Sequence, residues 1–269
     1  MKRLMLYLMV MSVGAISQAQ PNCNVYLWEG DTAQYKACML FTENMDDYYQ
    51  FDKAFHHLID SALTLCPHFA FAYWEKAAPY VKSGHFLEWK KNIDLAVKYD
   101  TLGYLPIRAS LRYKFFADYK GAIEDIEILE RISPVDIGYT SNGTYHLTIV
   151  KALCYKQMGD NNKARTIIEN LLQSKEYAVG LFDYLHLGVL YLEWGDVERA
   201  LVALHKQAAS GDVAEVHYYL ALVYRQLGNT EAYQKAKDTA IKMYAREMRM
   251  FDQYNYMIDQ IFEEDLDKL

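Results

Sequence analysis

Apolar side chains recur at intervals of three and four residues along most of this chain of 269 residues, which is the spacing of one face of an α-helix. The stretch from Tyr184 to Leu204 shows this pattern twice, on either side of Gly195-Asp196. Glycine favours the backbone conformation that ends a helix, and aspartate can cap the next helix. The stretch therefore predicts two short helices joined by a tight turn. The two apolar stripes are Leu187, Leu190 and Tyr191, followed by Ala200, Leu201 and Leu204.

This helix pair resembles the tetratricopeptide repeat, a helix hairpin of about 34 residues with the signature W-x2-L-G-x2-Y followed by A-x3-F. Gly188 and Ala200 carry little or no side chain, which allows the two helices to approach closely. The resemblance implies a stack of hairpins, because short helices are marginal alone in water and must bury their stripes against neighbours. The matching residues are Tyr184, Leu187, Gly188, Tyr191, Ala200 and Leu204.

Weaker copies of the same pattern precede and follow this stretch, and together they predict an all-α fold, an α-solenoid of about five to six hairpins in a superhelix. We expect residues 20–269 to form a single elongated domain, because 13 Gly and 5 Pro leave no room for a long flexible linker. Trp89 stands where a small residue is usual, and a bulky ring there would disturb the packing of its hairpin. The approximate repeats are 36–69, 70–102, 103–136, 145–178, 181–213 and 214–247.

The apolar spacing continues beyond the last repeat and predicts a capping helix over residues 248–269. Met250, Tyr254, Met257 and Ile261 recur at helical intervals, and an acidic end follows them. We expect the apolar face of this helix to cover the last hairpin, since the terminal elements of repeat proteins cap the stack. An alternative is that the helix folds back into the groove of the solenoid as an internal ligand.

About eight residues between the third and fourth repeats, 137–144, are extra relative to the repeat pattern and are rich in turn-forming residues. Insertions into solenoids project from one face, often the binding face. The favoured interpretation of this segment is a longer connector without a role of its own. The alternative is a loop beside a binding surface.

Residues 1–19 have the pattern of a secretory signal peptide. A short basic start precedes an apolar run at 4–16, and small residues follow at positions 17 and 19, which a signal peptidase reads. The run is shorter than the roughly 18 to 20 residues that span a membrane. A lipid anchor on Cys23 is the less favoured alternative, because the two residues before it do not fit a lipoprotein signal. We therefore expect a protein that is exported to the periplasm or beyond the cell and that spans no membrane after signal cleavage.

All four cysteines follow the predicted signal peptide, and four cysteines allow three pairings. A bridge between Cys23 and Cys38 would flank the start of the first helix, which Asp31 is placed to cap. Such a bridge would contribute roughly 3 kcal/mol by constraining the unfolded chain. We expect Cys66 and Cys154 to stay separate, as small buried hydrophobic side chains.

The charge of the chain argues against nucleic acid and anionic membranes as partners. The net charge is −7, and removal of Lys2 and Arg3 leaves 26 basic against 35 acidic residues, or about −9, without a run of lysines or arginines. The spacing of the eight histidines does not indicate a metal site. No motif for a nucleophile, a phosphate loop or a zinc protease is present. The sequence therefore predicts a protein without enzymatic activity, cofactor or metal, and it gives no indication of the oligomeric state.

The resemblance also implies a concave groove lined by the first helix of each hairpin, at positions that face away from the second helix. Aromatic and arginine side chains are frequent at these positions, and both are typical of interface hot spots. The candidate groove residues are Phe71, Trp74, Tyr104, Arg108, Leu111, Phe115, His146, Ile149, Phe182, Leu185, His186, Tyr218, Tyr219 and Arg225.

The favoured function is an exported interaction module that binds a protein or peptide in this groove, within a cell-envelope assembly. This function rests on analogy between folds. The alternative is a protein that binds a glycan or another small molecule through the aromatic side chains of the groove.

Overall fold

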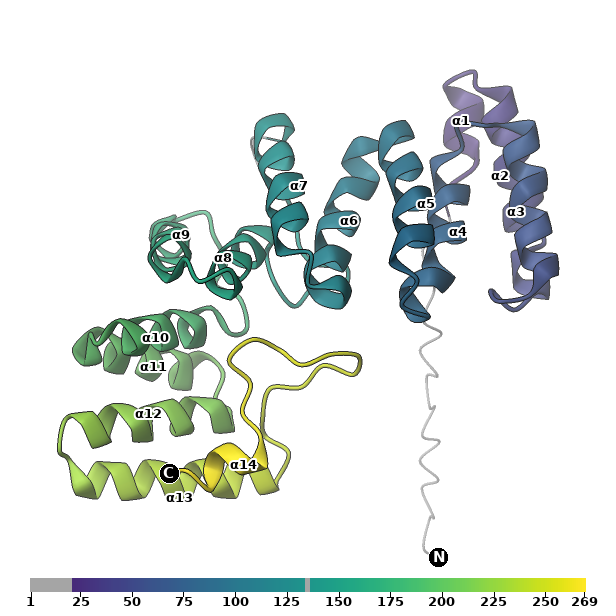
Figure 1. The fold of residues 1–269 in the computed structure, drawn as a ribbon. Helices are drawn as coiled ribbons and strands as arrows, with labels where there is room; N and C mark the ends of the chain where they lie inside the picture. The colour runs from purple at the N-terminus through teal and green to yellow at the C-terminus, as the bar shows by residue number, and fades with distance from the viewer. Residues whose placement is uncertain (1–20, 134–135) are drawn as a thin grey trace, which may run out of the picture. The chain divides into compact units, whose positions relative to one another are not determined.

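The computed structural model describes residues 21–133 and 136–269, so the predicted signal peptide lies outside the described residues. Within them, short turns join a series of α-helices (Figure 1), and the only β-pairing is an isolated bridge between Tyr139 and His146. The helices are α1 (Asn24–Trp28), α2 (Thr32–Thr42), η1 (Met45–Asp47), α3 (Lys53–Leu65), α4 (Ala70–Lys82), α5 (Phe86–Tyr99), α6 (Thr101–Phe116), α7 (Tyr119–Ile132), α8 (Leu147–Gln157), α9 (Asn161–Gln173), α10 (Asp183–Trp194), α11 (Val197–Ser210), α12 (Ala214–Gln226), α13 (Thr230–Ala245) and α14 (Glu263–Leu266).

The chain divides into two compact units, and the boundary lies between Lys76 and Ala77, inside α4. Unit 1 comprises the residues up to Lys76, and unit 2 comprises Ala77–Leu269. Each unit has a hydrophobic core of its own, one drawn from residues 23–72 and a larger one from residues 97–257.

In unit 1, the first helices enclose an aromatic core. Phe41 on α2 is fully buried, and its ring centroid lies 5.7 Å from those of Phe55 and Phe71, both in edge arrangements. A disulfide between Cys23 and Cys38 ties α1 to α2, which is the pairing that the sequence favours. Burial and the cross-link together hold a small unit whose apolar core is limited.

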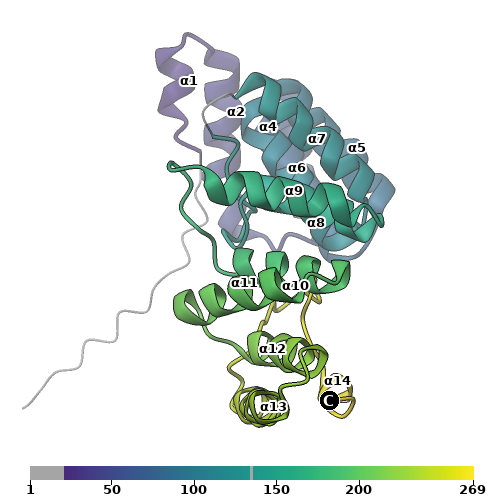
Figure 2. The ribbon, with the colours of Figure 1, turned by 90° about the vertical axis from the view of Figure 1, so that its left-hand side faces the viewer.

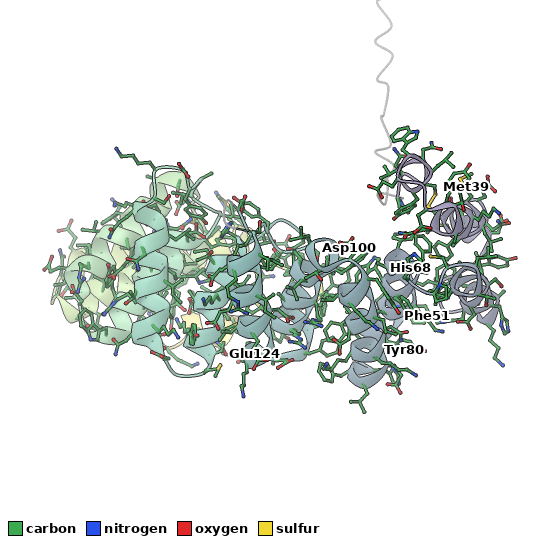
Figure 3. All side chains as sticks on the ribbon, turned by 90° about the horizontal axis from the view of Figure 1, so that it is seen from above. Met39, Phe51, His68, Tyr80, Asp100 and Glu124 are labelled. Atoms are coloured by element: carbon green, nitrogen blue, oxygen red, sulfur yellow. A yellow bond between two sulfur atoms is a disulfide. The ribbon has the colours of Figure 1, made fainter. Side chains whose placement is uncertain are left out.

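A polar contact fixes the start of α2 in the same unit. Asp31 caps the helix by accepting a hydrogen bond from the backbone N–H of Gln34 at 2.8 Å. Its second carboxylate oxygen lies 2.9 Å from Nε2 of His68. His68 follows α3 and is labelled in Figure 3. These two contacts lower the pKa of Asp31, the His68 contact most strongly. The predicted cap is therefore present.

Unit 2 is built from the hairpins α6/α7, α8/α9, α10/α11 and α12/α13, which stack one after the other (Figures 1 and 2). The second helix of each hairpin begins at a capping residue whose side chain accepts the backbone N–H three positions later, at 3.0 or 3.1 Å. The residue before the cap is in the left-handed conformation in all four hairpins and is glycine in three of them. The turn signal of the repeat is therefore confirmed. The caps are Asp118, Asp160, Asp196 and Asn229.

The small residue of the repeat signature has the packing role that its position implies. A Cβ atom placed on Gly188 would lie 2.8 Å from the side chain of Leu204, which is fully buried on the facing helix. Trp89, in contrast, does not disturb its surroundings. Its ring is fully buried and lies 4.5 Å from that of Phe116 at the end of α6, so the next hairpin accommodates it.

The predicted capping helix over 248–269 is wrong in extent. After α13 the chain runs without helix as far as Phe262, and only Glu263–Leu266 form the short helix α14. The predicted apolar positions Met250, Met257 and Ile261 are buried. However, side chains of α12 bind the backbone at three points, in place of some of the hydrogen bonds of a helix. Ile261 and Leu266 still cover the last hairpin, against Ala214 and Ala240 among others.

Candidate functional site

Residues 249–262, here called the C-terminal segment, lie along one face of unit 2. The segment contacts α6, α8, α10 and α12, which are the first helices of four successive hairpins, and the loop 137–146. Figures 1 and 2 show it in yellow beside α12. The side chains that contact it on these helices and this loop are called the docking face. The C-terminal residues therefore fold back onto the first helices of the hairpins, as in the alternative in which they act as an internal ligand. They do so as an irregular chain and not as a helix.

The deepest contact of the segment is made by Asp259. One carboxylate oxygen accepts a hydrogen bond from Nζ of Lys156 on α8 at 2.6 Å, and the other lies 2.7 Å from Nδ1 of His186 on α10. Its backbone carbonyl accepts a hydrogen bond from the hydroxyl of Tyr219 on α12 at 3.2 Å. A single residue is thus held by three successive hairpins.

The environment of Asp259 keeps its carboxylate charged. Burial alone would raise the pKa of Asp259, but the hydrogen bond from His186 and the charge of Lys156 outweigh it and leave the pKa below its ordinary value. Asp259 also takes a φ of 64°, in the left-handed region that is uncommon for a side chain larger than hydrogen. The strain is tolerated because these contacts determine the conformation.

A second carboxylate, Asp252, anchors the other arm of the segment. It forms an ion pair with Lys114 on α6 at 2.5 Å, and both side chains are almost buried, at 11% and 12% exposure. Asn142 of the loop 137–146 donates to the same carboxylate at 3.3 Å. Burial alone would raise the pKa of Asp252. The hydrogen bonds from Lys114 and from the backbone N–H of Tyr254 outweigh this effect, so the pKa lies below its ordinary value.

The loop 137–144 therefore has a structural link to the segment. The loop is also bonded to α6, because the backbone N–H of Ser141 donates a hydrogen bond to Oγ of Ser110 at 3.3 Å. A small pocket between loop and segment is lined by Tyr113, Thr140, Asn142, Asp252 and Met257, among others. The insertion thus lies beside the docking face.

Glu215 on α12 joins the two ends of the segment. Its carboxylate is fully buried and accepts hydrogen bonds from the backbone N–H of Met250 at 2.9 Å and of Ile261 at 3.4 Å. Burial raises the pKa of Glu215, and the backbone hydrogen bonds counteract this only in part. The segment is therefore a loop whose two ends are clipped to one side chain.

The structure divides the fourteen candidate groove residues among different environments. Phe71 and Trp74 belong to unit 1, whereas the others belong to unit 2. Four of them are buried core residues and therefore line no open groove. These four are Leu111, Ile149, Phe182 and Leu185.

Three other candidates contact the C-terminal segment. His186 and Tyr219 bind Asp259, and the ring of Phe115 lies 6.4 Å from that of Tyr254. Tyr218 packs beside Tyr219, with ring centroids 5.1 Å apart. The structure thus brings these four predicted residues to one face.

The remaining candidates are engaged elsewhere or stand apart. Arg108 donates to Asp125 through two nitrogens, at 2.6 and 2.9 Å, and is therefore part of a buried ion pair. His146 caps α8 and lies 3.0 Å from Asp136. Tyr104 packs against the core of unit 2, and Arg225 is exposed.

Sequence reasoning missed the charged residues that hold the segment. Lys114, Lys156 and Glu215 fall on amphipathic helices, where charges are usually solvated, and Asp252 and Asp259 fall in a stretch predicted as helix. The sequence did contain one signal of the segment, since Asp252 and Asp259 lie seven positions apart among apolar residues. Within the described residues, no group of three or more His, Cys, Asp or Glu side chains is placed to hold a metal ion.

The fold can be compared with known proteins. No protein-family model matches the chain, and no curated protein matches its sequence. Among solved structures, PilF of Pseudomonas aeruginosa is 13% identical, with coverage of 80% of this chain and 93% of that chain and a TM-score of 0.57. PilW, described as a widely conserved type IV pilus biogenesis factor, is 13% identical, with coverage of 80% and 94% and a TM-score of 0.55. BtubC from P. vanneervenii is 16% identical, with coverage of 90% and 99% and a TM-score of 0.54.

Similarities at this level of identity concern the fold. The chain has the all-α solenoid fold of tetratricopeptide-repeat proteins, which confirms the resemblance found in its sequence.

Proposed function

We propose that this protein is an exported, non-enzymatic interaction module that binds an extended segment of a partner protein on the docking face of unit 2. The observation that carries this proposal is the C-terminal segment itself. It lies on the face as an irregular chain, held by side chains from four first helices and by hydrogen bonds to its backbone. A surface that binds one extended segment in this way has the features that peptide recognition requires.

Export is proposed from the N-terminal pattern at 1–19, which lies outside the described residues. The disulfide between Cys23 and Cys38 supports this compartment, because such bridges persist in oxidising environments. Cys23 is also engaged in that bridge, which disfavours a lipid anchor on its sulfur. In the part of the chain that the structure describes, no helix is both long and apolar enough to cross a membrane. A partner in the cell envelope fits this compartment.

The proposal can be tested by affinity capture of residues 20–269 from envelope extracts of the source organism. The wild-type chain is compared with the variant Lys114→Glu/Lys156→Glu, which reverses both charges of the docking face. A matched control is Lys235→Glu/Lys242→Glu, because these lysines are exposed on α13, away from the segment. Circular dichroism establishes that each variant folds.

We expect a reproducible partner protein that is retained by the wild type and the control and lost with the docking-face variant. A partner that is retained equally by all three proteins would show that the docking face is not the site. Absence of any protein together with a co-purifying glycan would overturn the proposal in favour of the second candidate.

That second candidate is a glycan-binding protein, and one observation favours it. The rings of Tyr254 and Tyr256 on the C-terminal segment are 71% and 79% exposed, which leaves aromatic faces accessible to a sugar. In this case the variant Tyr254→Ala/Tyr256→Ala would lose the glycan, whereas the Lys114→Glu/Lys156→Glu variant would lose it only if the segment moved.

A further inference from the structure

We propose that the C-terminal segment is an intramolecular ligand of the docking face, and that the partner replaces it with an extended acidic segment. The partner segment would carry two carboxylates about seven positions apart and a large apolar side chain two positions before the second. This inference rests on the proposed function and specifies its partner class. It follows from how the segment is held, from the charges opposite it, and from the way its ends are fixed.

The segment is held at a few points rather than along its whole length. Asp252 and Asp259 are the polar anchors, and Met257 between them is buried. Positions between these two aspartates face solvent, since Tyr254 is 71% and Tyr256 is 79% exposed. A pattern of two or three anchors separated by solvated positions is that of a bound peptide.

The docking face supplies the complementary charges. Among the described residues, the only ion pair of Lys114 is with Asp252. Lys156 pairs with Asp259 at 2.6 Å and with Glu193 at 3.0 Å, and its side chain is 8% exposed. Departure of the segment takes Asp252 away from Lys114 and Asp259 away from Lys156, so the face that it uncovers carries two positive charges that have each lost a carboxylate. An incoming segment must therefore bring carboxylates to the same two places.

The segment can leave without unfolding the hairpins. Glu215 binds the backbone of both Met250 and Ile261, so the ends of the loop stay together when its middle part is released. The backbone N–H groups of Tyr254 and Asn255 bond to Asp252, which is within the segment, so these bonds can be kept after release. Exposed side chains, such as those of Tyr254 and Tyr256, are a feature of segments that open locally.

The test uses a fluorescent peptide with the sequence of residues 250–261 and the whole chain after signal cleavage. A release variant, Asp252→Asn/Asp259→Asn, removes both anchors from the protein's own segment. A matched control is Glu264→Gln/Asp267→Asn, which removes two exposed carboxylates outside the segment. Fluorescence anisotropy then measures the affinity of each protein for the peptide and for a peptide in which both aspartates are replaced by asparagine.

We expect the release variant to bind the acidic peptide at least tenfold more tightly than the wild type and the control do. It should also prefer the acidic peptide over the asparagine peptide by at least tenfold, because only the former satisfies Lys114 and Lys156. Equal affinity of the wild type and the release variant would show that the segment does not compete. That result would overturn this inference and leave the proposed function standing.

A folded release variant that binds neither peptide would overturn the inference as well. If the double substitution fails to fold, the milder variant Tyr219→Phe/Asn255→Ala takes its place, since it removes only neutral hydrogen bonds between segment and body. Formation of dimers by the wild-type chain that the release variant does not form, measured by light scattering, would assign the face to the C-terminal segment of a second copy. That result would overturn the assignment of the face to a different partner.

The proposed function fails in a different way. If the capture experiment identifies a partner that binds the docking face without an acidic segment, the function holds and the partner class is wrong. If the peptide binds as expected but no partner is captured, the docking face is a site for the chain's own segment alone, and the proposed function fails.

Discussion

Replacement of Asp259 by asparagine is the change that measures how firmly the C-terminal segment is docked. The wild-type carboxylate is 6% exposed and faces Lys156 at 2.6 Å and His186 at 2.7 Å. Removal of one partner from a buried ion pair costs about 3–5 kcal/mol. Asparagine keeps one hydrogen bond and Lys156 keeps Glu193 at 3.0 Å, so we expect a loss of about 2–3 kcal/mol.

The assay is urea denaturation of the wild type and of Asp259→Asn, with circular dichroism as the measure of unfolding. Asp267→Asn is the matched control, because this carboxylate is exposed and its loss should change the free energy of unfolding by less than about 0.5 kcal/mol. The loss of unfolding free energy caused by Asp259→Asn cannot exceed the free energy with which the segment docks. A larger loss would release the segment from the docking face and leave the rest of the fold unchanged. A loss for Asp259→Asn no larger than that of the control would refute the reasoning.

The same pair of proteins has a defined pH dependence. The pKa of Asp259 is lower in the folded chain than its ordinary value, so its carboxylate stabilises the fold above the unfolded pKa and this contribution is lost as the pH falls through the folded pKa. The difference between wild type and Asp259→Asn should be constant near neutrality and shrink below about pH 4. A difference that persists unchanged at pH 3 would contradict the assigned charge state.

Three further substitutions test the repeat architecture by denaturation. Gly188→Val should cost about 1–3 kcal/mol, because the new side chain would overlap Leu204, and an unchanged midpoint would contradict the close approach. Ala117→Gly should raise the free energy of unfolding by about 0.5–1 kcal/mol, since Ala117 has a φ of 49° at a helix end, and a decrease would count against this. Cys23→Ser/Cys38→Ser should destabilise unit 1 by about 3 kcal/mol, and reductant should then have no further effect.

The hairpins could be predicted from sequence because their signals are local. A left-handed residue, a capping side chain and an apolar stripe lie within a few positions of one another, as at Gly195, Asp196 and Ala200. The disulfide was accessible for the same reason, since its cysteines are 15 positions apart and flank one helix start. These features depend little on the rest of the chain.

The docking face could not be predicted because its contacts are distant in sequence. Lys114 and Asp252 are 138 positions apart, and His186 and Asp259 are 73 apart. No pattern along the chain distinguishes Lys114 from a solvated lysine on a helix surface. The spacing of Met250, Met257 and Ile261 satisfied the rule for a helix, yet the same side chains are buried by a loop that Glu215 holds at both ends.

The burial of Ile149 and Leu185 has a similar cause. Outward positions of a first helix face either the groove or the next hairpin, and the two cannot be separated without knowledge of how the hairpins stack. In this chain these positions pack into the core. Only the residues nearest the C-terminal segment, such as Tyr219, remain on the docking face.

Hydrogen–deuterium exchange of the chain after signal cleavage, with and without a captured partner, tests most directly whether the docking face exchanges one extended segment for another. We predict that the partner increases deuterium uptake at residues 251–258 and decreases it at the ends of α6, α8 and α10 that carry Lys114, Lys156 and His186. Unchanged uptake at 251–258 with protection elsewhere in the chain would contradict the account.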